Sequence, residues 1–219
     1  MPPYWVSVVM EFSVLISVAI SFLKVQQVSK DYIPFVISLW FNLFGCIVSE
    51  FTMRVWGSNA VSANCYFIIF SLLILWQFKR WRLFDNRPSD FYVLIAVFVV
   101  IWIIDNFIVG SLFVFNPYAR IINSMVMVFL SIHLLSSQLT IRPEPFWKSA
   151  KQLILVTYIL LLTVKIATEF FWQFGSQLGD LFMNNVSSIY QYINFAANLL
   201  YAYTMLWIPV TTRYSWLSR

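Results

Sequence analysis

The sequence predicts an all-α membrane protein built as a bundle of seven transmembrane helices. Of its 219 residues, 61% are hydrophobic and only 11% are charged. So few charged residues cannot supply the polar surface that a soluble domain of this length needs. The apolar residues also gather into runs of about 20, the length at which an α-helix crosses the roughly 30 Å hydrocarbon core of a bilayer.

Seven such runs follow one another, separated by short polar segments. The predicted helices cover residues 4–23, 33–53, 59–79, 91–111, 117–140, 149–172 and 184–208, in one domain spanning 1–219. The first run is expected to be a retained helix, because its start, MPPYWVSVV, has no basic segment or cleavage site. Gly45 is the only glycine well inside a run, and every proline lies near an end or between runs. No helix interrupted by glycine or proline near the midplane is therefore visible, which disfavours a transporter that binds substrate at such a break.

Loop charge predicts the orientation of the bundle, because lysine and arginine concentrate on the cytoplasmic side of membrane proteins. Arg54 and Arg120 lie at helix ends on one side. The opposite side is flanked by Lys24, Lys30, Lys79, Arg80, Arg82, Arg87, Arg142, Lys148, Lys151, Arg213 and Arg219. We therefore predict an outside N-terminus and a cytoplasmic C-terminus.

Most ionisable side chains inside the predicted helices fall in the outer half of the bundle, at a rise of about 1.5 Å per residue. They are the candidate ligand-binding or ion-binding residues Glu11, Glu50, Asp105, Arg120, Lys165 and Glu169. The supporting polar residues are Asn42, Asn106, His133, Gln191, Asn194 and Asn198. Asp105 and Lys165 share a depth, so we favour them as a pair. Glu169, one turn beyond Lys165, is the alternative partner.

Two interpretations of this cluster remain open. Charged groups inside a membrane are costly, so these side chains either join the helices through salt bridges or serve a function. The functional interpretation, which we favour slightly, is a polar pocket that opens outward. The cluster has four acids against two bases. The surplus could hold a cationic ligand, or protonation of a buried carboxyl could relieve it.

His133 is the only histidine, and a hydrogen bond between helices is its simplest role. A pH-sensing role is the alternative, because histidine titrates near neutrality. Cys46 and Cys65 fall at similar depths on neighbouring predicted helices. We expect them to be free buried thiols, although a disulfide is geometrically conceivable.

Asn194, Asn198 and Tyr201 follow one another at helical spacing, so they share one face of the last predicted helix. This face is expected to be a packing seam with hydrogen bonds, and Asn42 is a plausible partner across it. A pocket wall is the alternative.

Several chemistries lack the residues that they need. A catalytic zinc site needs about three histidine, cysteine or carboxylate ligands, and the single histidine argues against one. No GxSxG elbow and no glycine-rich phosphate loop are present. Opsins carry their retinal lysine in the last helix, whereas residues 184–207 contain none. We therefore expect no catalytic residue, no metal, no cofactor and no nucleic-acid partner.

The segments FNLFGCIVSEF (41–51) and INFAANLLYAY (193–203), set in this rhythm of apolar runs, resemble small seven-span membrane proteins of bacteria. The resemblance covers most of the chain through mainly apolar motifs. It implies a seven-helix bundle in the bacterial cytoplasmic (inner) membrane, and it implies no catalytic residue.

The leading functional hypothesis is a non-enzymatic multipass membrane protein. It would bind a small molecule, a lipid or a protein partner in the outer-half pocket and signal through a membrane or cytoplasmic partner. Asp105 and Lys165 would orient the ligand, and aromatic residues such as Trp102 would line the apolar wall. The first alternative is a small transporter or channel in which Asp105, Lys165 and the glutamates relay protons or cations. A lipid-acting intramembrane enzyme has the least support.

Overall fold

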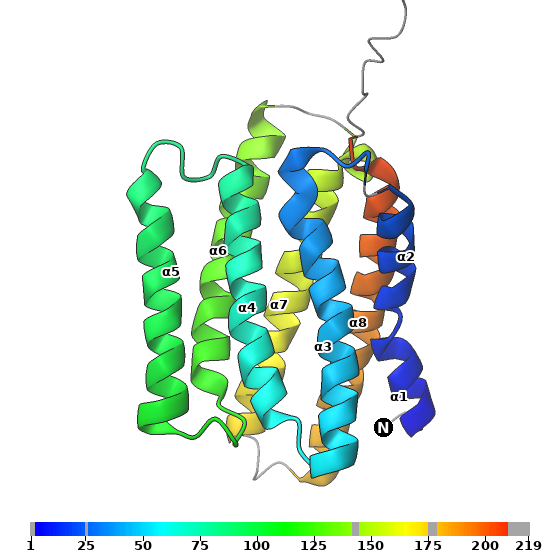
Figure 1. Cartoon of the computed structure of the whole chain (residues 1–219), viewed down its shortest axis with the longest axis vertical. Coiled ribbons are helices and arrows are strands. Elements are labelled where there is room, and N and C mark those ends of the chain that lie inside the picture. Colours follow the sequence, from blue (N-terminus) through cyan, green and yellow to red (C-terminus); the bar gives the residue numbers. More distant parts are fainter. Residues whose placement is uncertain (1–2, 25, 142–144, 175–178, 210–219) are drawn as a thin grey trace, which may run out of the picture.

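The computed structural model describes residues 3–24, 26–141, 145–174 and 179–209, and the chain is all-helical there. Seven long helical segments run up and down the molecule (Figure 1). They are α1 (Tyr4–Glu11) with α2 (Val14–Lys24), α3 (Ile33–Trp56), α4 (Ala60–Arg80), α5 (Pro88–Ile103) with the π-helical η2 (Ile104–Val109), α6 (Pro117–Ile141), α7 (Ala150–Phe174) and α8 (Asp180–Trp207). Two short 3₁₀ turns, η1 (Lys30–Tyr32) and η3 (Phe146–Lys148), precede α3 and α7.

Six of these segments are long and apolar enough to cross a membrane, which indicates an integral membrane protein. They are Tyr4–Lys24, Lys30–Trp56, Ala60–Arg80, Pro88–Val109, Pro117–Thr140 and Ala150–Gln173. The helix α8 is not in this group, although it has 28 residues. Its asparagines, serines and Gln191 lower its hydropathy, and several of them face the interior of the bundle.

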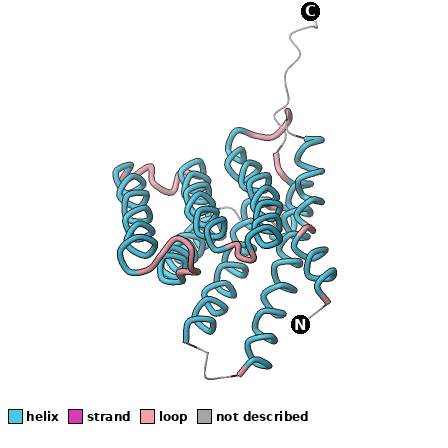
Figure 2. Tube along the Cα trace, turned by 60° about the horizontal axis from the view of Figure 1, so that its bottom comes forward, coloured by secondary structure: helices cyan, strands magenta, loops and turns pink. Residues whose placement is uncertain are grey.

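Six segments close into a ring. The first segment packs on α3 and on α8, and the ring continues from α3 through α4, α6 and α7 back to α8. The helix α5 lies outside the ring, against α4 and α6, and forms one edge of the molecule (Figures 1 and 2). An apolar helix of this bundle can therefore lie within the ring, as α4 does, or outside it, as α5 does.

The two ends of the bundle differ in charge. At one end, the upper end in Figure 1, α2 and α4 finish in Lys24 and Arg80, and α7 begins near Lys148 and Lys151. We call it the basic end. At the other end α3 passes into α4, η2 into α6 and α7 towards α8. We call it the cavity end, for the hollow described below.

The half of the bundle towards the basic end has a packed apolar core. Rings from different helices meet edge to face in it, with centroids 5.5 Å apart for Phe35 and Tyr201 and 6.3 Å apart for Phe78 and Tyr158. The Gln77 side chain accepts a hydrogen bond from the Phe35 N–H (2.8 Å) and donates one to the Asp31 carbonyl (2.6 Å), which fixes the start of α3. The core residues that are at most 2% exposed here include Phe35, Leu39, Ile74, Leu75, Phe78, Ile154, Leu155, Tyr158 and Met205.

The first segment is broken between α1 and α2, at Phe12 and Ser13, where no proline or glycine occurs. The Ser13 hydroxyl donates to the Met10 carbonyl at 2.6 Å and accepts from the Asn198 amide of α8 at 2.9 Å. A serine side chain can in this way compete with the helical backbone pattern. The break contains neither of the two residues, glycine and proline, from which the sequence could indicate an interrupted helix.

Candidate functional site

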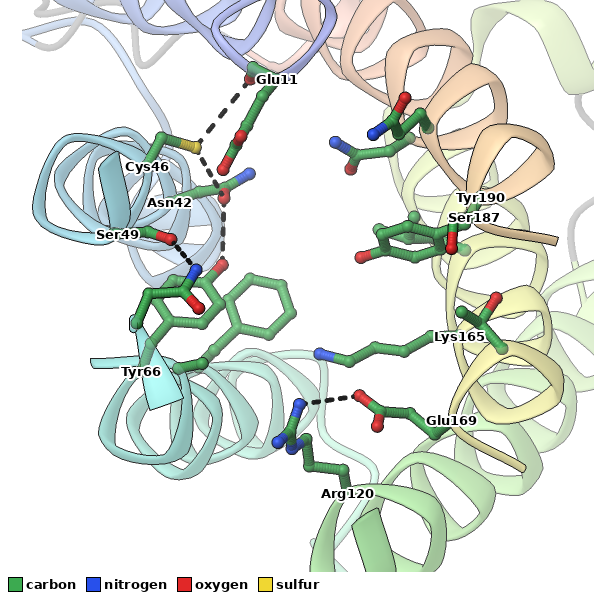
Figure 3. A pocket seen from close by; sticks show the side chains of 18 of the residues that line it. Glu11, Asn42, Cys46, Ser49, Tyr66, Arg120, Lys165, Glu169, Ser187 and Tyr190 are labelled. Atoms are coloured by element: carbon green, nitrogen blue, oxygen red, sulfur yellow. Dashed lines mark hydrogen bonds and ion pairs between the residues drawn. The ribbon is translucent and has the colours of Figure 1, made fainter. Parts of the chain in front are cut away.

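A cavity of about 510 Å³ occupies the centre of the ring at the cavity end. Its walls come from α1, α3, α4, α6, α7 and α8, and polar side chains point into it from several sides (Figure 3). The polar and ionisable lining residues include Ser7, Glu11, Asn42, Ser49, Asn59, Ser62, Arg120, Lys165, Thr168, Glu169, Ser187, Tyr190, Gln191 and Asn194. The structure thus brings four of the six predicted ionisable residues to one cavity.

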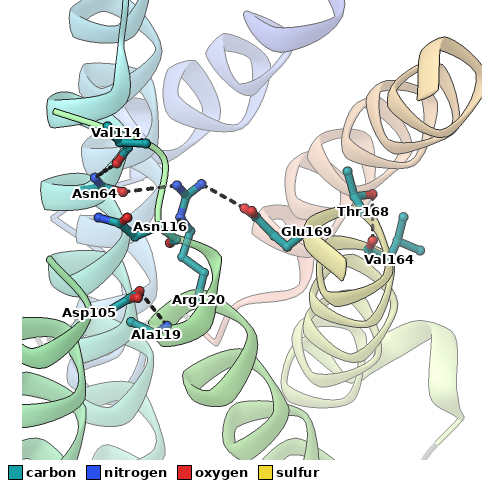
Figure 4. A network of polar contacts seen from close by, with 9 residues as sticks. All are labelled: Asn64, Asp105, Val114, Asn116, Ala119, Arg120, Val164, Thr168 and Glu169. Carbon is teal, nitrogen blue, oxygen red and sulfur yellow. Dashed lines mark hydrogen bonds and ion pairs between the residues drawn. The ribbon is translucent and has the colours of Figure 1, made fainter. Parts of the chain in front are cut away.

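Arg120 connects three helices, α4, α6 and α7, and we call its contacts the Arg120 joint. Its guanidinium binds the Glu169 carboxylate of α7 at 2.8 Å, the Asn64 side-chain oxygen of α4 at 3.1 Å and the Asn116 carbonyl at 3.1 Å (Figure 4). Only 8% of Arg120 is exposed. Charge-assisted hydrogen bonds of this kind are the strong ones, particularly away from water. The Arg120–Glu169 pair therefore has an evident structural role.

The same joint extends to the segment that connects η2 with α6. The Asn64 amide donates to the carbonyls of Leu112 (3.1 Å) and Val114 (2.8 Å). Trp102, predicted to line an apolar pocket wall, instead donates its indole N–H to the Asn64 carbonyl at 2.9 Å. These contacts tie α5 and the following segment to α4.

Asp105 does not pair with Lys165, so that prediction was wrong. Its carboxylate accepts the backbone N–H of Ala119 at 2.8 Å, in the first turn of α6. A carboxylate there satisfies a free donor and complements the positive end of the helix dipole. Asn106 accepts a hydrogen bond from the Asn116 amide at 3.1 Å. Both residues connect η2 to the start of α6 and lie outside the cavity lining.

Lys165 is half-buried, and its side chain extends from α7 into the cavity (Figure 3). Its ammonium lies 4.6 Å from the centroid of the Phe67 ring, a cation–π contact. It makes no hydrogen bond or ion pair with any residue that the structure describes. The alternative partner, Glu169, is held by Arg120 instead.

Glu11 ends α1 and enters the cavity from a different wall than Lys165 (Figure 3). No basic side chain in the described ranges forms an ion pair with it. The Cys46 thiol lies beside it, 3.9 Å from the Glu11 backbone carbonyl. Cys46 and Cys65 are both free, as predicted, although only Cys46 is buried.

Tyr66 forms an aromatic wall that sequence reasoning did not identify. Its ring stacks between Phe41 and Phe70, with centroids 5.3 and 5.5 Å away, and its hydroxyl donates to the Asn42 side chain at 3.0 Å. A Cβ on Gly45 would lie only 2.5 Å from the Tyr66 ring. The lone glycine inside a span was the available signal, since glycine permits close approach.

The polar face of α8 serves both predicted roles, the pocket wall and the packing seam. Gln191 and Asn194 line the cavity, and Gln191 accepts a hydrogen bond from the Ser7 hydroxyl at 3.1 Å. Asn198 is 1% exposed and donates a hydrogen bond at 2.9 Å to the hydroxyl of Ser13, which lies between α1 and α2. Asn42 pairs with Tyr66 across the cavity wall, and no hydrogen bond to α8 is among its described contacts.

Two predicted residues lie outside the cavity lining. Glu50 forms an ion pair with Arg54 at 2.7 Å and accepts a hydrogen bond from the Tyr4 hydroxyl, near the surface. His133 is exposed on α6 and forms no hydrogen bond within the described part of the chain. The expected bridge between helices through His133 was therefore wrong.

The cavity contains two acids, Glu11 and Glu169, and two bases, Arg120 and Lys165. The predicted acid surplus is absent from it, because Glu50 and Asp105 are engaged elsewhere. No three histidine, cysteine or carboxylate side chains gather into a possible metal site among the residues described. The arrangement can hold a polar molecule through charge and hydrogen bonds.

Comparison with known proteins finds no family model, no curated protein and no solved structure that matches this chain.

Proposed function

We propose that this protein is a non-enzymatic, seven-span membrane protein that binds a small molecule or lipid in the cavity. The observation that carries the proposal is the Lys165 ammonium, which extends into a cavity of about 510 Å³ and forms no ion pair with a described residue, although the charge of Glu169, one turn along α7, acts on it. The volume lies within the roughly 300–1,000 Å³ that is usual for small-molecule sites.

The energetic cost of Lys165 supports a functional role. A lysine near the centre of a membrane-spanning helix costs about 2.5 to 3.5 kcal/mol on insertion scales. A lysine that served only to join helices would be expected to bind an acceptor on another helix. Arg120 already performs that task by binding Glu169 and Asn64. A ligand that supplies the missing acceptor would account for Lys165.

Loop charge supports an outside N-terminus and a cytoplasmic C-terminus. The resemblance to small seven-span proteins of bacteria supports a place in the inner membrane of a bacterium. The cavity would then open towards the outer face. The connections between the described helices are short, for example residues 81–87 between α4 and α5. Binding would therefore be communicated through a membrane or cytoplasmic protein partner.

A transporter is the second candidate, and the break between α1 and α2 favours it. Transporters commonly place their binding sites where a membrane helix is interrupted, and Glu11 lies directly before this break. Uptake of a bound compound into liposomes, abolished by Glu11→Gln, would support transport. A reconstituted protein that binds a compound and moves none would favour the binding module.

The proposed function is tested by thermal unfolding of the purified protein against a panel of metabolites, ions and lipids. A ligand at 100 times its dissociation constant should stabilise the wild type by about 2.7 kcal/mol. Lys165→Met should lose this shift. Asp105→Asn is the matched control, because it weakens the cap of α6 outside the cavity: it should lower stability but keep the shift. A panel without any shift, or a shift that survives in Lys165→Met, would contradict the proposal.

A further inference from the structure

Two opposite charges without ion-pair partners face the cavity from different walls. The Lys165 ammonium comes from α7, and the Glu11 carboxylate comes from α1 (Figure 3). Neither forms an ion pair with the residues described, whereas the other two charged lining residues, Arg120 and Glu169, neutralise each other at 2.8 Å. The cavity therefore presents one positive and one negative charge to a ligand.

The broken first segment strengthens the negative side. Glu11 is the last residue of α1, and a helix C-terminus carries partial negative charge, here reduced because the carbonyls of Val8 and Met10 accept hydrogen bonds from the N–H groups of Phe12 and Ser13. The C-terminal ends of interrupted membrane helices are used to bind cations for this reason. The carboxylate and the helix end thus both favour a cationic group at this wall.

The positive side of the cavity is formed by the Lys165 ammonium. The Phe67 ring lies 4.6 Å from the Lys165 ammonium, which makes no hydrogen bond to a described residue and so keeps its donors for an acceptor. The Thr168 hydroxyl, one turn along α7, is not available as a donor in the same way, because it already donates to the Val164 carbonyl at 2.9 Å. A carboxylate or phosphate bound at Lys165 would therefore meet a free ammonium.

A ligand of a single charge would leave one of these groups uncompensated. A simple anion at Lys165 would leave Glu11 without a partner, and a simple cation at Glu11 would leave Lys165 without one. Both side chains are half-buried, and an unpaired charge loses part of its hydration in such a place. A molecule that carries both charges compensates both walls at once, and its neutral total charge matches the balanced cavity.

We infer that the cavity selects a zwitterion, whose acidic group binds Lys165 and whose ammonium binds Glu11 at the end of α1. This inference rests on the proposed function, because it names the ligand class of the same cavity. The rings of Tyr66 and Phe70 on α4 and of Tyr190 on α8 line the space and accommodate an apolar portion of the ligand. Two sources share this chemistry: a free α-amino acid and the ethanolamine phosphate headgroup of a lipid.

The first arm of the test uses soluble probes on the full chain in nanodiscs of phosphatidylglycerol, whose headgroup has no ammonium and cannot occupy the site as a zwitterion. L-phenylalanine carries both charges, N-acetyl-L-phenylalanine only the negative one and L-phenylalanine amide only the positive one. The other common α-amino acids complete the panel. If the source is an amino acid, at least one should bind about tenfold more tightly than its acetylated and amide derivatives.

The second arm compares thermal stability in nanodiscs of phosphatidylethanolamine and of phosphatidylglycerol, which lacks the ammonium. If the source is a lipid headgroup, the wild type should be more stable in phosphatidylethanolamine. Variants then assign each charge. Glu11→Gln should bind the zwitterion no better than the acetylated probe, and Lys165→Met no better than the amide. Lys165→Arg retains the positive charge and should retain binding, which separates loss of charge from misfolding. Asp90→Asn, which changes an exposed acid at the start of α5 outside the cavity lining, is the matched control for Glu11→Gln.

The outcomes separate this inference from the proposed function. Preference for the zwitterion in either arm, lost in both charge-removing variants, supports both. Binding of a compound that depends on Lys165 but not on Glu11, with equal affinity for anion and zwitterion, overturns the inference and leaves the proposed function intact. If no compound or lipid from the combined panels binds, both are rejected.

Discussion

The two halves of the bundle use the same helices for different purposes. Towards the basic end α7 contributes Leu155 and Tyr158, which are at most 1% exposed, to a packed apolar core. Two turns further along, the same helix directs Lys165 and Glu169 into the cavity. Along α3 the residues likewise change from Phe35 and Leu39 in the core to Asn42, Gly45 and Ser49 at the cavity.

This difference suggests a division of labour. A site for a ligand needs empty space and incompletely satisfied polar groups, which reduce stability where they occur. A rigid scaffold beside the site has to hold its side chains in place. The packed half supplies that scaffold, and the Arg120 joint carries rigidity into the cavity half. Substitutions in the two halves should therefore have different consequences.

The largest loss of stability is expected from Arg120→Met. It would leave the Glu169 carboxylate and the Asn64 side chain without their partner in a largely buried place. Removing one member of a buried pair costs about 3 to 5 kcal/mol. Denaturant titration in detergent micelles measures this change. The control is Arg54→Gln, which removes an exposed ion pair at the same end and should not change the unfolding midpoint. Equal effects of the two substitutions would contradict the account of the joint.

The next largest effect separates the two halves directly through two Leu→Ala substitutions on α7. Leu155 is fully buried in the packed core, and Leu155→Ala should cost about 3 kcal/mol, because it creates a new cavity. Leu161→Ala should cost clearly less, since Leu161 already lines empty space and only enlarges it. Measuring the free energy of unfolding of both variants tests this order. The reverse order would show that the hollow is filled or collapsed in the protein.

A smaller loss of stability, of about 1 to 3 kcal/mol, is expected from Gly45→Ala. The added methyl group would press on the Tyr66 ring, which is held between Phe41 and Phe70. A double-mutant cycle with Tyr66→Ala tests the contact, because the penalty of Gly45→Ala should disappear once the ring is removed. Additive penalties would mean that the two residues do not touch.

The smallest effect is expected from His133→Ala. The side chain is exposed on α6, away from the cavity lining, and it bonds to no other residue described. Melting temperatures recorded between pH 5 and pH 8 should be the same for the variant and the wild type. A pH dependence that the substitution removes would restore the histidine as a pH sensor.

Sequence reasoning predicted the helices well and their neighbours poorly. The thickness of the bilayer sets the length of an apolar run, so the seven segments could be placed from the positions of these runs in the sequence. Depth followed from helical rise, which is why Glu11, Arg120, Lys165 and Glu169 were all selected and do share the cavity. Orientation and the number of spans remain predictions.

The errors arose where depth does not determine contact. Asp105 has the same predicted depth as Lys165, but its helix lies outside the ring, where its nearest backbone donor is Ala119. The break at Ser13 was missed because only proline and glycine were considered as helix breakers. Tyr66 was missed because a tyrosine among so many apolar residues gives no distinct signal, although Gly45 marked the place where its ring packs.

The central claim, that Lys165 serves a ligand rather than the fold, is tested most directly by the stability of Lys165→Met without any added compound. If the ammonium is uncompensated, the variant should be more stable than the wild type, by about 1 kcal/mol or more, because an apolar side chain of similar length replaces a charge. The binding of stabilising compounds should be lost at the same time. A variant that is less stable than the wild type and still binds would show that Lys165 holds the bundle together, and would contradict the account.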